Sequence, residues 1–344
     1  MVGFSDKGFM GANPETEATK EQIATEVRLQ IFRHGIKAAK GEGQGDKDIV
    51  LSEQGREGAR AKAIAGGELN ALAYGSPRVR SQETAAYVMS GSGLDSLDGI
   101  KKELMFERDI SRDKNFTITE DTFKTFTKGS SKMENPLQQT RVAVDERLDF
   151  NEDDKSEYGK KFYADFAAGK YLPFLFNESD AYAKEVGDTE GSTYSRFAGN
   201  VAEIIEKYYT ASDAWNKIKN RPDDGKSEEY IGATLNRLLG THAGVGECFL
   251  GKLIEKMKGP EEKEKFLHLF DVKNGDKVVN NGFDYVEGFD VRIKQEGTDK
   301  KIFISYKKDL PDNTQYVFEE EVPKKVIDEL VEEGNLSKQV NQKV

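Results

Sequence analysis

The stretch Val27-Arg-Leu-Gln-Ile-Phe32, followed directly by Arg33-His34-Gly35, decides the fold of this chain. Residues 27–32 alternate between apolar and polar side chains, a pattern typical of a β-strand. The tripeptide therefore follows the carboxyl end of a predicted strand, which is where open α/β sheets bind their ligands. A loop rich in glycine and lysine, residues 37–48, comes next.

Downstream of this loop, helix and strand patterns alternate. A helix is predicted from about residue 51 to 65, with Ser52 as its N-cap and Gly66-Gly67 at its end. A second strand is predicted at residues 72–76, and a helix behind it at residues 82–89. This order of elements favours an α/β architecture.

A long segment of mixed charge, about residues 91–191, interrupts the alternation and is interpreted as an insertion of helices and loops. The regular pattern then returns as an amphipathic helix through residues 197–208, a strand at 234–239, a helix through 249–257, β-hairpins between about 281 and 306, and a last helix at 322–333. The succession predicts one three-layer α/β/α sandwich with C-terminal β-hairpins. We expect a single domain over residues 24–344, with the insertion as a lid and residues 1–23 as a loose leader.

The composition limits the classes of function. Acidic residues outnumber basic ones by 62 to 51, and the resulting formal charge of −11 argues against nucleic-acid binding, because that function needs a basic surface. No apolar run approaches the ~20 residues needed to cross a bilayer, and residues 1–20 show no secretory signal pattern. Because Cys248 is the single cysteine, we expect a cytoplasmic protein without an internal disulfide.

Two of the three histidines, His34 and His242, directly follow predicted strands. A neutral imidazole is a competent nucleophile toward phosphorus. Arg33 and Arg80 offer planar forks of donors that fit phosphate oxygens, and they would neutralise the charge of a phosphoryl group during its transfer. These residue types at strand ends predict a phosphate site.

Four segments occur in the order of the motifs of a known family. They are Arg33-His34-Gly35, the helix start Leu51-Ser52-Glu53-Gln54-Gly55, the run from Ser76 to Ala85, and Thr241-His242-Ala243-Gly244-Val245. Together they resemble the signature of the histidine phosphatase superfamily, which is also called phosphoglycerate-mutase-like. The resemblance implies the phosphoglycerate-mutase type of α/β/α sandwich. It touches roughly the first quarter of the chain and the segment around residue 242.

The resemblance also implies a phosphohistidine mechanism that needs no metal or other cofactor. His34 would attack the phosphorus, while Arg33, Arg80 and His242 would bind the transferred group. Arg78 is an alternative phosphate ligand, although the spacing of the motif favours Arg80.

A carboxylic acid must protonate the leaving oxygen, and its identity stays open at this point. In the smaller branch of the family an Asp directly follows the second histidine. Here Ala243 occupies that place, which favours the larger branch, where a glutamate follows a later strand. The run Val142-Ala-Val-Asp-Glu-Arg-Leu148 looks like a strand that ends in a glutamate, so Glu146 is the candidate acid and Glu107 the alternative.

We therefore expect a metal-independent phosphatase that hydrolyses a small-molecule or protein phosphomonoester through phospho-His34. Two alternatives remain. One is a phosphomutase, although Ile36-Lys37-Ala38 lacks the acidic and asparagine-bearing pattern expected of cofactor-dependent phosphoglycerate mutases. The other is a non-catalytic phosphate-binding or phosphoprotein-binding module that kept the phosphate ligands and lost the acid. The sequence determines neither the substrate nor the oligomeric state.

Overall fold

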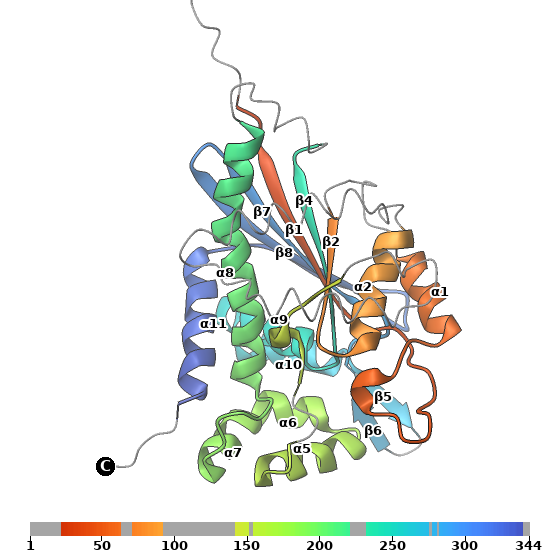
Figure 1. Cartoon of the computed structure of the whole chain (residues 1–344). Helices are drawn as coiled ribbons and strands as arrows, with labels where there is room; N and C mark the ends of the chain where they lie inside the picture. Colours follow the sequence, from red (N-terminus) through yellow and green to blue (C-terminus); the bar gives the residue numbers. More distant parts are fainter. Residues whose placement is uncertain are drawn as a thin grey trace, which may run out of the picture.

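The computed structural model describes residues 22–62, 71–91, 142–150, 154–220, 232–274, 277–280 and 282–339. These residues form a seven-stranded sheet with helices on both of its faces (Figure 1). Residues 1–21 of the predicted leader, the pair Gly66-Gly67 and Glu107 lie outside the described residues.

The sheet has the strand order β3-β2-β4-β1-β7-β8-β9, and its first four strands are parallel to one another. The remaining three strands continue it in antiparallel pairing. The strands are β1 Thr25–Arg33, β2 Ala71–Gly75, β3 Val142–Val144, β4 Thr234–Thr241, β7 Gly288–Glu296, β8 Asp299–Asp309 and β9 Gln315–Val322, with β5 Asp271–Asn274 and β6 Lys277–Asn280 as a separate hairpin.

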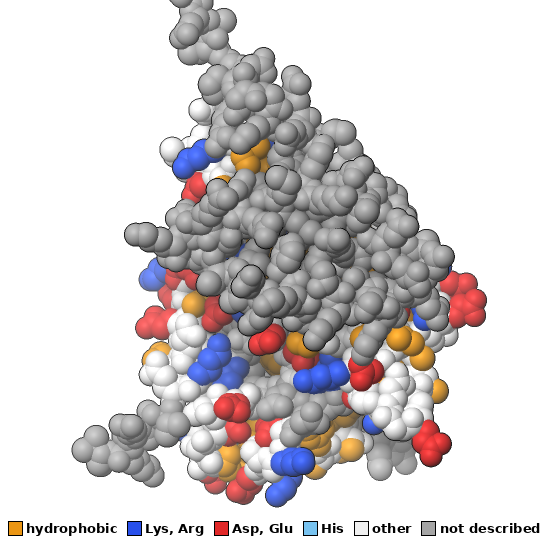
Figure 2. All heavy atoms as spheres, in the orientation of Figure 1, with side chains coloured by type: hydrophobic (Ala, Val, Ile, Leu, Met, Phe, Trp, Pro, Cys, Tyr) orange, Lys and Arg blue, Asp and Glu red, His pale blue; other side chains and the backbone are white. Residues whose placement is uncertain are grey.

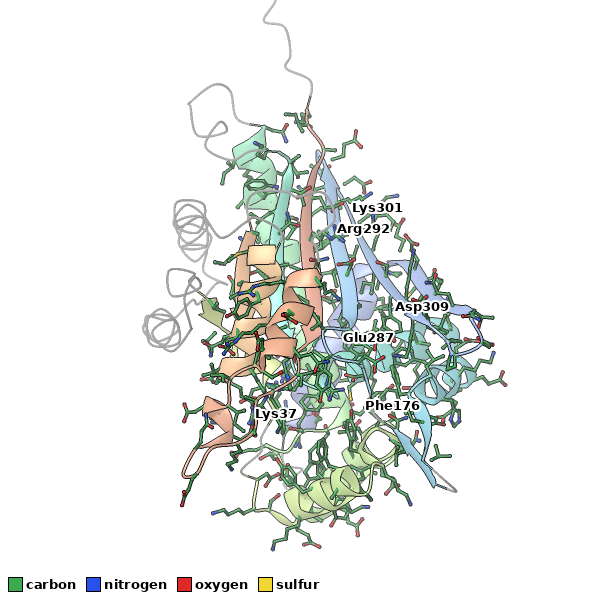
Figure 3. The ribbon with its side chains drawn as sticks, turned by 90° about the vertical axis from the view of Figure 1, so that its right-hand side faces the viewer. Lys37, Phe176, Glu287, Arg292, Lys301 and Asp309 are labelled. Carbon is green, nitrogen blue, oxygen red and sulfur yellow. The ribbon has the colours of Figure 1, made fainter. Side chains whose placement is uncertain are left out.

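The helices form the two outer layers. They are α1 Glu53–Ala61, α2 Val79–Gly91, α5 Glu157–Ala167, α6 Tyr171–Asn177, α7 Ser179–Val186, α8 Tyr194–Lys219, α9 Val245–Lys258, α10 Pro260–His268 and α11 Lys324–Ser337, with short 3-10 turns η1 Asp46–Asp48 and η3 Glu146–Leu148. The first two, α1 and α2, lie on one side of the sheet, and α8 and α11 lie on the other (Figures 1 and 3). The predicted three-layer sandwich is confirmed.

The pattern of burial along β1 shows that one face of the sheet is apolar and the other polar. Val27, Leu29 and Ile31 are fully buried on the face that α8 covers, together with Val291 and Ile293 of the neighbouring β7. Because strand side chains alternate between faces, the polar residues of β1 lie on the opposite face. An apolar core on one face thus fixes the register of the whole central ladder.

Most predicted elements are confirmed near their expected ends. The hydroxyl of Ser52 caps α1 by accepting a hydrogen bond from the N–H of Gly55 at 3.1 Å. Two segments belong to the central sheet, although the sequence pattern did not assign them to it. Within the proposed insertion, β3 pairs with β2 and forms one edge of the sheet, and the C-terminal hairpin strands extend the same sheet at its other edge.

Helices α5, α6 and α7 lie at the end of the sheet where β1 and β4 end (Figure 1). On the molecular face in Figure 2, acidic and basic side chains of the described residues are interspersed. None of the helices in the described part of the chain is long and apolar enough to cross a membrane.

Candidate active site

The pairing of β1 with β4 brings the two motif histidines together. Arg33 lies opposite Thr241 in this parallel ladder, and the backbone N–H of His34 donates to the carbonyl of Thr241 at 2.8 Å. The imidazole rings of His34 and His242 consequently lie 5.1 Å apart, measured between their centroids. The two motif histidines therefore lie at the same edge of the sheet.

Glycines allow the helices to approach the site closely. A Cβ atom at Gly35 would lie 2.8 Å from the carbonyl oxygen of Gly55 in α1, and one at Gly75 would lie 2.6 Å from the backbone nitrogen of Gln82 in α2. Both distances are too short for a real side chain, so glycine is required by packing. The close contact sets the first turn of α2, which carries Arg80, against the strand ends.

The hydrogen bonds of His34 leave one ring nitrogen available as a nucleophile. Nδ1 lies 2.7 Å from the carbonyl oxygen of Gly35, so it carries the proton and donates it there. Nε2 is then the acceptor, and the Nε–H of Arg80 points at it from 3.3 Å. A lone pair on Nε2 therefore faces a guanidinium group that binds oxyanions well.

Burial keeps this imidazole neutral. His34 is 8% exposed, and burial, reinforced by the positive charges of Arg80, Arg33 and Lys37, lowers its pKa from 6.5 to about 3. The pKa of His242 is also lowered well below its ordinary value, mainly by burial. A neutral His34 is the form that can attack phosphorus.

Thr84 joins the loop that carries His34 to Arg80. Its hydroxyl oxygen accepts a hydrogen bond from the N–H of Gly35 at 3.0 Å, and the hydroxyl donates to the carbonyl of Arg80 at 2.7 Å. Both the loop after β1 and the first turn of α2 are thus held by one buried side chain. This contact explains why the threonine belongs to the same motif as Arg80.

His242 is enclosed by hydroxyl and carboxylate oxygens. Its Nε2 lies 2.7 Å from the hydroxyl of Ser76, 3.1 Å from that of Ser81 and 3.4 Å from Oδ1 of Asp149. The ring of Phe150 packs edge-on against the imidazole at 5.1 Å between centroids. His242 is therefore fixed in orientation beside His34.

Arg33 is held by the loop that leads into β7. Its guanidinium donates to the carbonyl of Phe283 and lies 4.7 Å from the centre of the Tyr285 ring.

The fully buried carboxylate of Glu247 accepts hydrogen bonds from the N–H groups of Phe283 at 2.7 Å and Gly244 at 2.8 Å. Burial raises the pKa of Glu247. This side chain connects the loop after His242 to the loop around Arg33.

Asp46 of η1 occupies the guanidinium groups that a phosphate would use. Its Oδ2 lies 2.7 Å from Nη2 of Arg80 and 2.6 Å from Nη1 of the fully buried Arg78, while Oδ1 lies 3.6 Å from Nζ of Lys37. An anionic carboxylate in this position resembles a bound oxyanion in its charge and in its hydrogen-bond partners. Arg78, the alternative phosphate ligand, therefore also lies in the site.

The structure does not bring Glu146 to the histidines. Glu146 is exposed on η3, and its side chain has no hydrogen bond or ion pair with another described residue. Asp149, three residues later, lies beside His242 and pairs with Nε of Arg78 at 2.7 Å. In the sequence, the one feature that could have pointed to Asp149 is its position shortly after β3, because the resemblance places the acid after such a strand. Among the described residues, no cluster of His, Cys, Asp and Glu could hold a metal ion.

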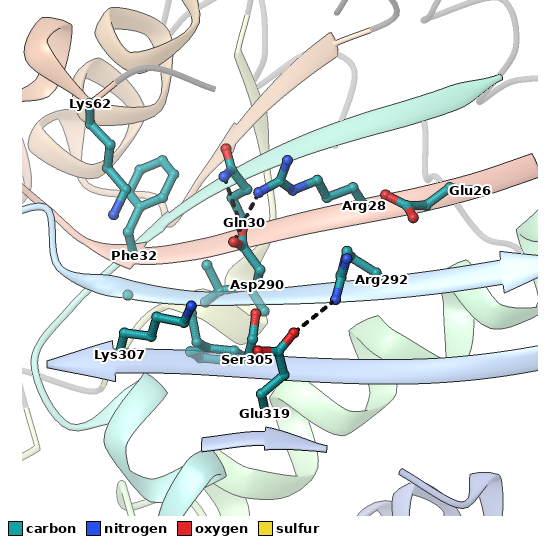
Figure 4. Close-up of a pocket in the computed structure, with 13 residues that line it drawn as sticks. Glu26, Arg28, Gln30, Phe32, Lys62, Asp290, Arg292, Ser305, Lys307 and Glu319 are labelled. Atoms are coloured by element: carbon teal, nitrogen blue, oxygen red, sulfur yellow. Dashed lines mark hydrogen bonds and ion pairs between the residues drawn. The ribbon is translucent and has the colours of Figure 1, made fainter. Parts of the chain in front are cut away.

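A separate groove of about 490 Å³ lies on the polar face of β1, β7, β8 and β9 (Figure 4). Its charged groups pair with one another: Arg28 with Asp290 at 2.9 Å, and Arg292 with Glu319 at 3.4 Å. In Figure 3, Arg292 lies farther along the sheet than Lys37 and Glu287, which mark the site end. The groove is thus distinct from the cluster around His34.

Comparison with known protein families agrees with this geometry. The model of the histidine phosphatase superfamily (branch 1) matches residues 29–148, about a third of the chain. The matched segment carries Arg33, His34 and Arg80, and it ends one residue before Asp149. Residues 29–148 are thus similar to the histidine phosphatase superfamily (branch 1), and the resemblance drawn from the motifs is confirmed over that segment.

Solved structures with a related arrangement include a mycobacterial glucosyl-3-phosphoglycerate phosphatase and a phosphoglycerate mutase from Bacillus anthracis str. Sterne. The phosphatase is 15% identical, with 79% of this chain and 91% of that chain covered at a TM-score of 0.35. The mutase is 16% identical, with 91% and 98% covered at a TM-score of 0.38. Comparison with curated proteins gave no match.

The lowered pKa of His34 predicts a loss of stability in acid. Between its ordinary pKa of 6.5 and about 3, the unfolded chain binds a proton at this position that the folded protein does not bind. The free energy of unfolding therefore falls as the pH drops below 6.5, by up to about 1.4 kcal/mol per pH unit for this group. We expect the free energy of unfolding of His34→Asn, which keeps a donor for Gly35, to fall less steeply than that of the wild type between pH 6.5 and 4. Urea unfolding at a series of pH values measures this; parallel curves for the two proteins would contradict it.

Removal of the Asp46 charge should strengthen phosphate binding. In Asp46→Asn, the guanidinium groups of Arg78 and Arg80 lose the negative charge at residue 46, and one charge-assisted hydrogen bond corresponds to about tenfold in affinity. We expect titration calorimetry to show inorganic phosphate binding about tenfold more tightly to Asp46→Asn than to the wild type. Asp48→Asn, an exposed change on the same turn, should leave the affinity unchanged. Equal or weaker binding by Asp46→Asn would show that the carboxylate does not compete for the site.

Proposed function

We propose that this protein is a metal-independent phosphatase that hydrolyses a phosphomonoester through a phosphohistidine intermediate on His34. The observation that carries the proposal is the state of His34. Its Nδ1–H is committed to Gly35, and its Nε2 lone pair faces Arg80. The family match over residues 29–148 supports the same chemistry.

In the first step, the Nε2 lone pair of His34 forms a bond to phosphorus while the bond from phosphorus to the ester oxygen breaks. Arg33 and Arg80 stabilise the negative charge spread over the remaining phosphoryl oxygens. His242 lies on the other side of His34 and offers a further hydrogen-bonding group to the transferred phosphoryl. The site needs no movement of the strands for this, because the groups already converge.

Asp149 is the proposed general acid in place of Glu146. Protonated, its carboxyl gives a proton to the leaving oxygen as the alcohol departs. In the second step the resulting carboxylate takes a proton from water, the water oxygen bonds to phosphorus, and the bond to Nε2 breaks. Inorganic phosphate leaves, and both His34 and Asp149 return to their starting states.

A carboxyl group beside His242 also favours an enzyme over a binding module that lost its acid. Asp149 lies 3.4 Å from His242 and carries a fixed partner in Arg78, so the second half of the reaction has a candidate base. The proposed substrate is a small-molecule or protein phosphomonoester.

Replacement of His34 should abolish turnover at the chemical step. We expect the wild type to release p-nitrophenol from p-nitrophenyl phosphate in the presence of EDTA, and His34→Asn to lose at least about 10³ in rate, because no nucleophile remains. A phosphate-labelled substrate quenched in alkali should leave label on the wild type only, since phosphohistidine survives alkali and decomposes in acid. Label retained by His34→Asn would contradict the assignment of the nucleophile.

The identity of the acid can be tested by varying the leaving group. An alkyl phosphate needs protonation of its leaving oxygen, whereas p-nitrophenolate leaves without it, so Asp149→Asn should lower kcat/KM by about 10² for propyl phosphate and much less for p-nitrophenyl phosphate. Glu146→Gln is the matched control and should change neither value. An equal loss on both substrates would assign Asp149 a structural role, and a selective loss in Glu146→Gln would restore Glu146 as the acid.

A further inference from the structure

The ring of Tyr285 lies at the site without belonging to the core. It is 48% exposed, and its centroid is 6.3 Å from that of His34 and 4.7 Å from the guanidinium carbon of Arg33. Large aromatic side chains normally contribute to stability by being buried. An aromatic ring left half exposed beside a buried nucleophile is placed to contact what approaches that nucleophile.

The loop that carries Tyr285, residues 282–287, is fixed to the residues of the site. The backbone of Arg33 forms two hydrogen bonds with it: its N–H donates to Glu287 at 2.9 Å, and its carbonyl accepts from Val286 at 3.1 Å. Lys62, which follows α1, donates to the carbonyl of Val286 at 2.6 Å. Tyr285 thus lies between two anchored residues.

The side chain of Glu287 adds a second set of anchors. Its carboxylate accepts a hydrogen bond from the hydroxyl of Tyr306 at 2.6 Å and pairs with Lys308 at 2.9 Å, both of them on β8. The position of Tyr285 is therefore determined by the antiparallel half of the sheet, which lies outside the segment that matches the family.

The backbone next to Tyr285 is strained. Val286 has a φ of +62°, a left-handed conformation that a β-branched residue rarely adopts. Such strain persists only where the surrounding structure enforces it, and it is concentrated at functional sites. Here the hydrogen bonds from Val286 to Arg33 and from Lys62 to Val286 enforce it.

A second aromatic ring contacts the other histidine. Phe150 packs against His242, and its ring lies 4.3 Å from the guanidinium carbon of Arg78. Each histidine thus has one aromatic neighbour, Tyr285 for His34 and Phe150 for His242. Tyr285 is the more exposed of the two rings and the one nearer the nucleophile.

We propose that Tyr285 is a specificity residue whose ring stacks on a planar aromatic leaving group, so that the preferred substrates are phosphate esters of aromatic alcohols. The inference rests on the proposed phosphatase function and names its substrate class. The phosphoryl group occupies the arginines and histidines, and the aryl group leaves along the face of Tyr285. Ring-on-ring contact of this kind corresponds to about three- to tenfold in affinity or rate.

The test compares two esters of similar size and different shape. Phenyl phosphate carries a planar ring and cyclohexyl phosphate a saturated one. We expect Tyr285→Leu to lower kcat/KM for phenyl phosphate about three- to tenfold and for cyclohexyl phosphate less than twofold, while Tyr285→Phe keeps the wild-type values. Leucine retains apolar bulk, so only the loss of the aromatic face distinguishes it from phenylalanine.

Binding of phenylphosphonate and cyclohexylphosphonate tests the same contact without turnover, because a phosphonate has no ester bond to hydrolyse. We expect calorimetry to show a preference for phenylphosphonate in the wild type and in Tyr285→Phe, and none in Tyr285→Leu. If Tyr285→Leu lost affinity equally for both phosphonates, or lost none, the proposed role of Tyr285 would be overturned, while the proposed phosphatase function would stand. A retained preference for phenylphosphonate in a wild type without any turnover would support the role of Tyr285 and refute the proposed function.

Discussion

The hydrogen bond from the N–H of His34 to the carbonyl of Thr241 closes the end of the β1–β4 ladder, and the arrangement of the site depends on it. Parallel pairing places the carboxyl ends of both strands at one edge, so two histidines more than 200 residues apart become neighbours. Glycines at Gly35 and Gly75 then admit α1 and α2 to within backbone contact. A shift of one residue in this register would turn the apolar face of β1 toward the polar side of the sheet.

The strands and helices of the parallel half of the fold could be predicted from the sequence, because each depends on a local pattern. His34 and His242 follow strands that periodicity locates, whereas Arg80 was singled out by its place in the family motif, because the predicted helix at residues 82–89 begins after it. Asp46 and Asp149 were not identified, because their importance comes from contacts with Arg78 that join segments far apart in the chain. Strands β7 and β8 fall within the predicted hairpins, whereas β9 was not predicted, and nothing local indicates that β7 pairs with β1.

The charges of this buried site are carried by arginine and aspartate side chains. The two histidines are neutral, so the positive charge resides on arginines, and Arg78 lies between Asp46 and Asp149 with no exposed surface. A buried cation is tolerated only when it is paired and hydrogen-bonded; here Asp46 supplies the anionic partner of Arg78, and Oδ1 of Asp149 accepts a hydrogen bond from its Nε–H. The two aspartates thus stabilise the buried guanidinium of Arg78 in the absence of a ligand.

The contact of Asp46 with the arginines has a consequence for how the site empties. Because the carboxylate belongs to the same chain, its effective concentration at the guanidinium groups is set by the loop, on the order of millimolar or above, and does not depend on the surroundings. A departing phosphate anion would be replaced by Asp46 in an exchange of partners, so the buried cations would not need to be rehydrated between one ligand and the next. The loop after β1 supplies an internal counter-ion, and release of the phosphate anion would then be a substitution instead of a separation of charges.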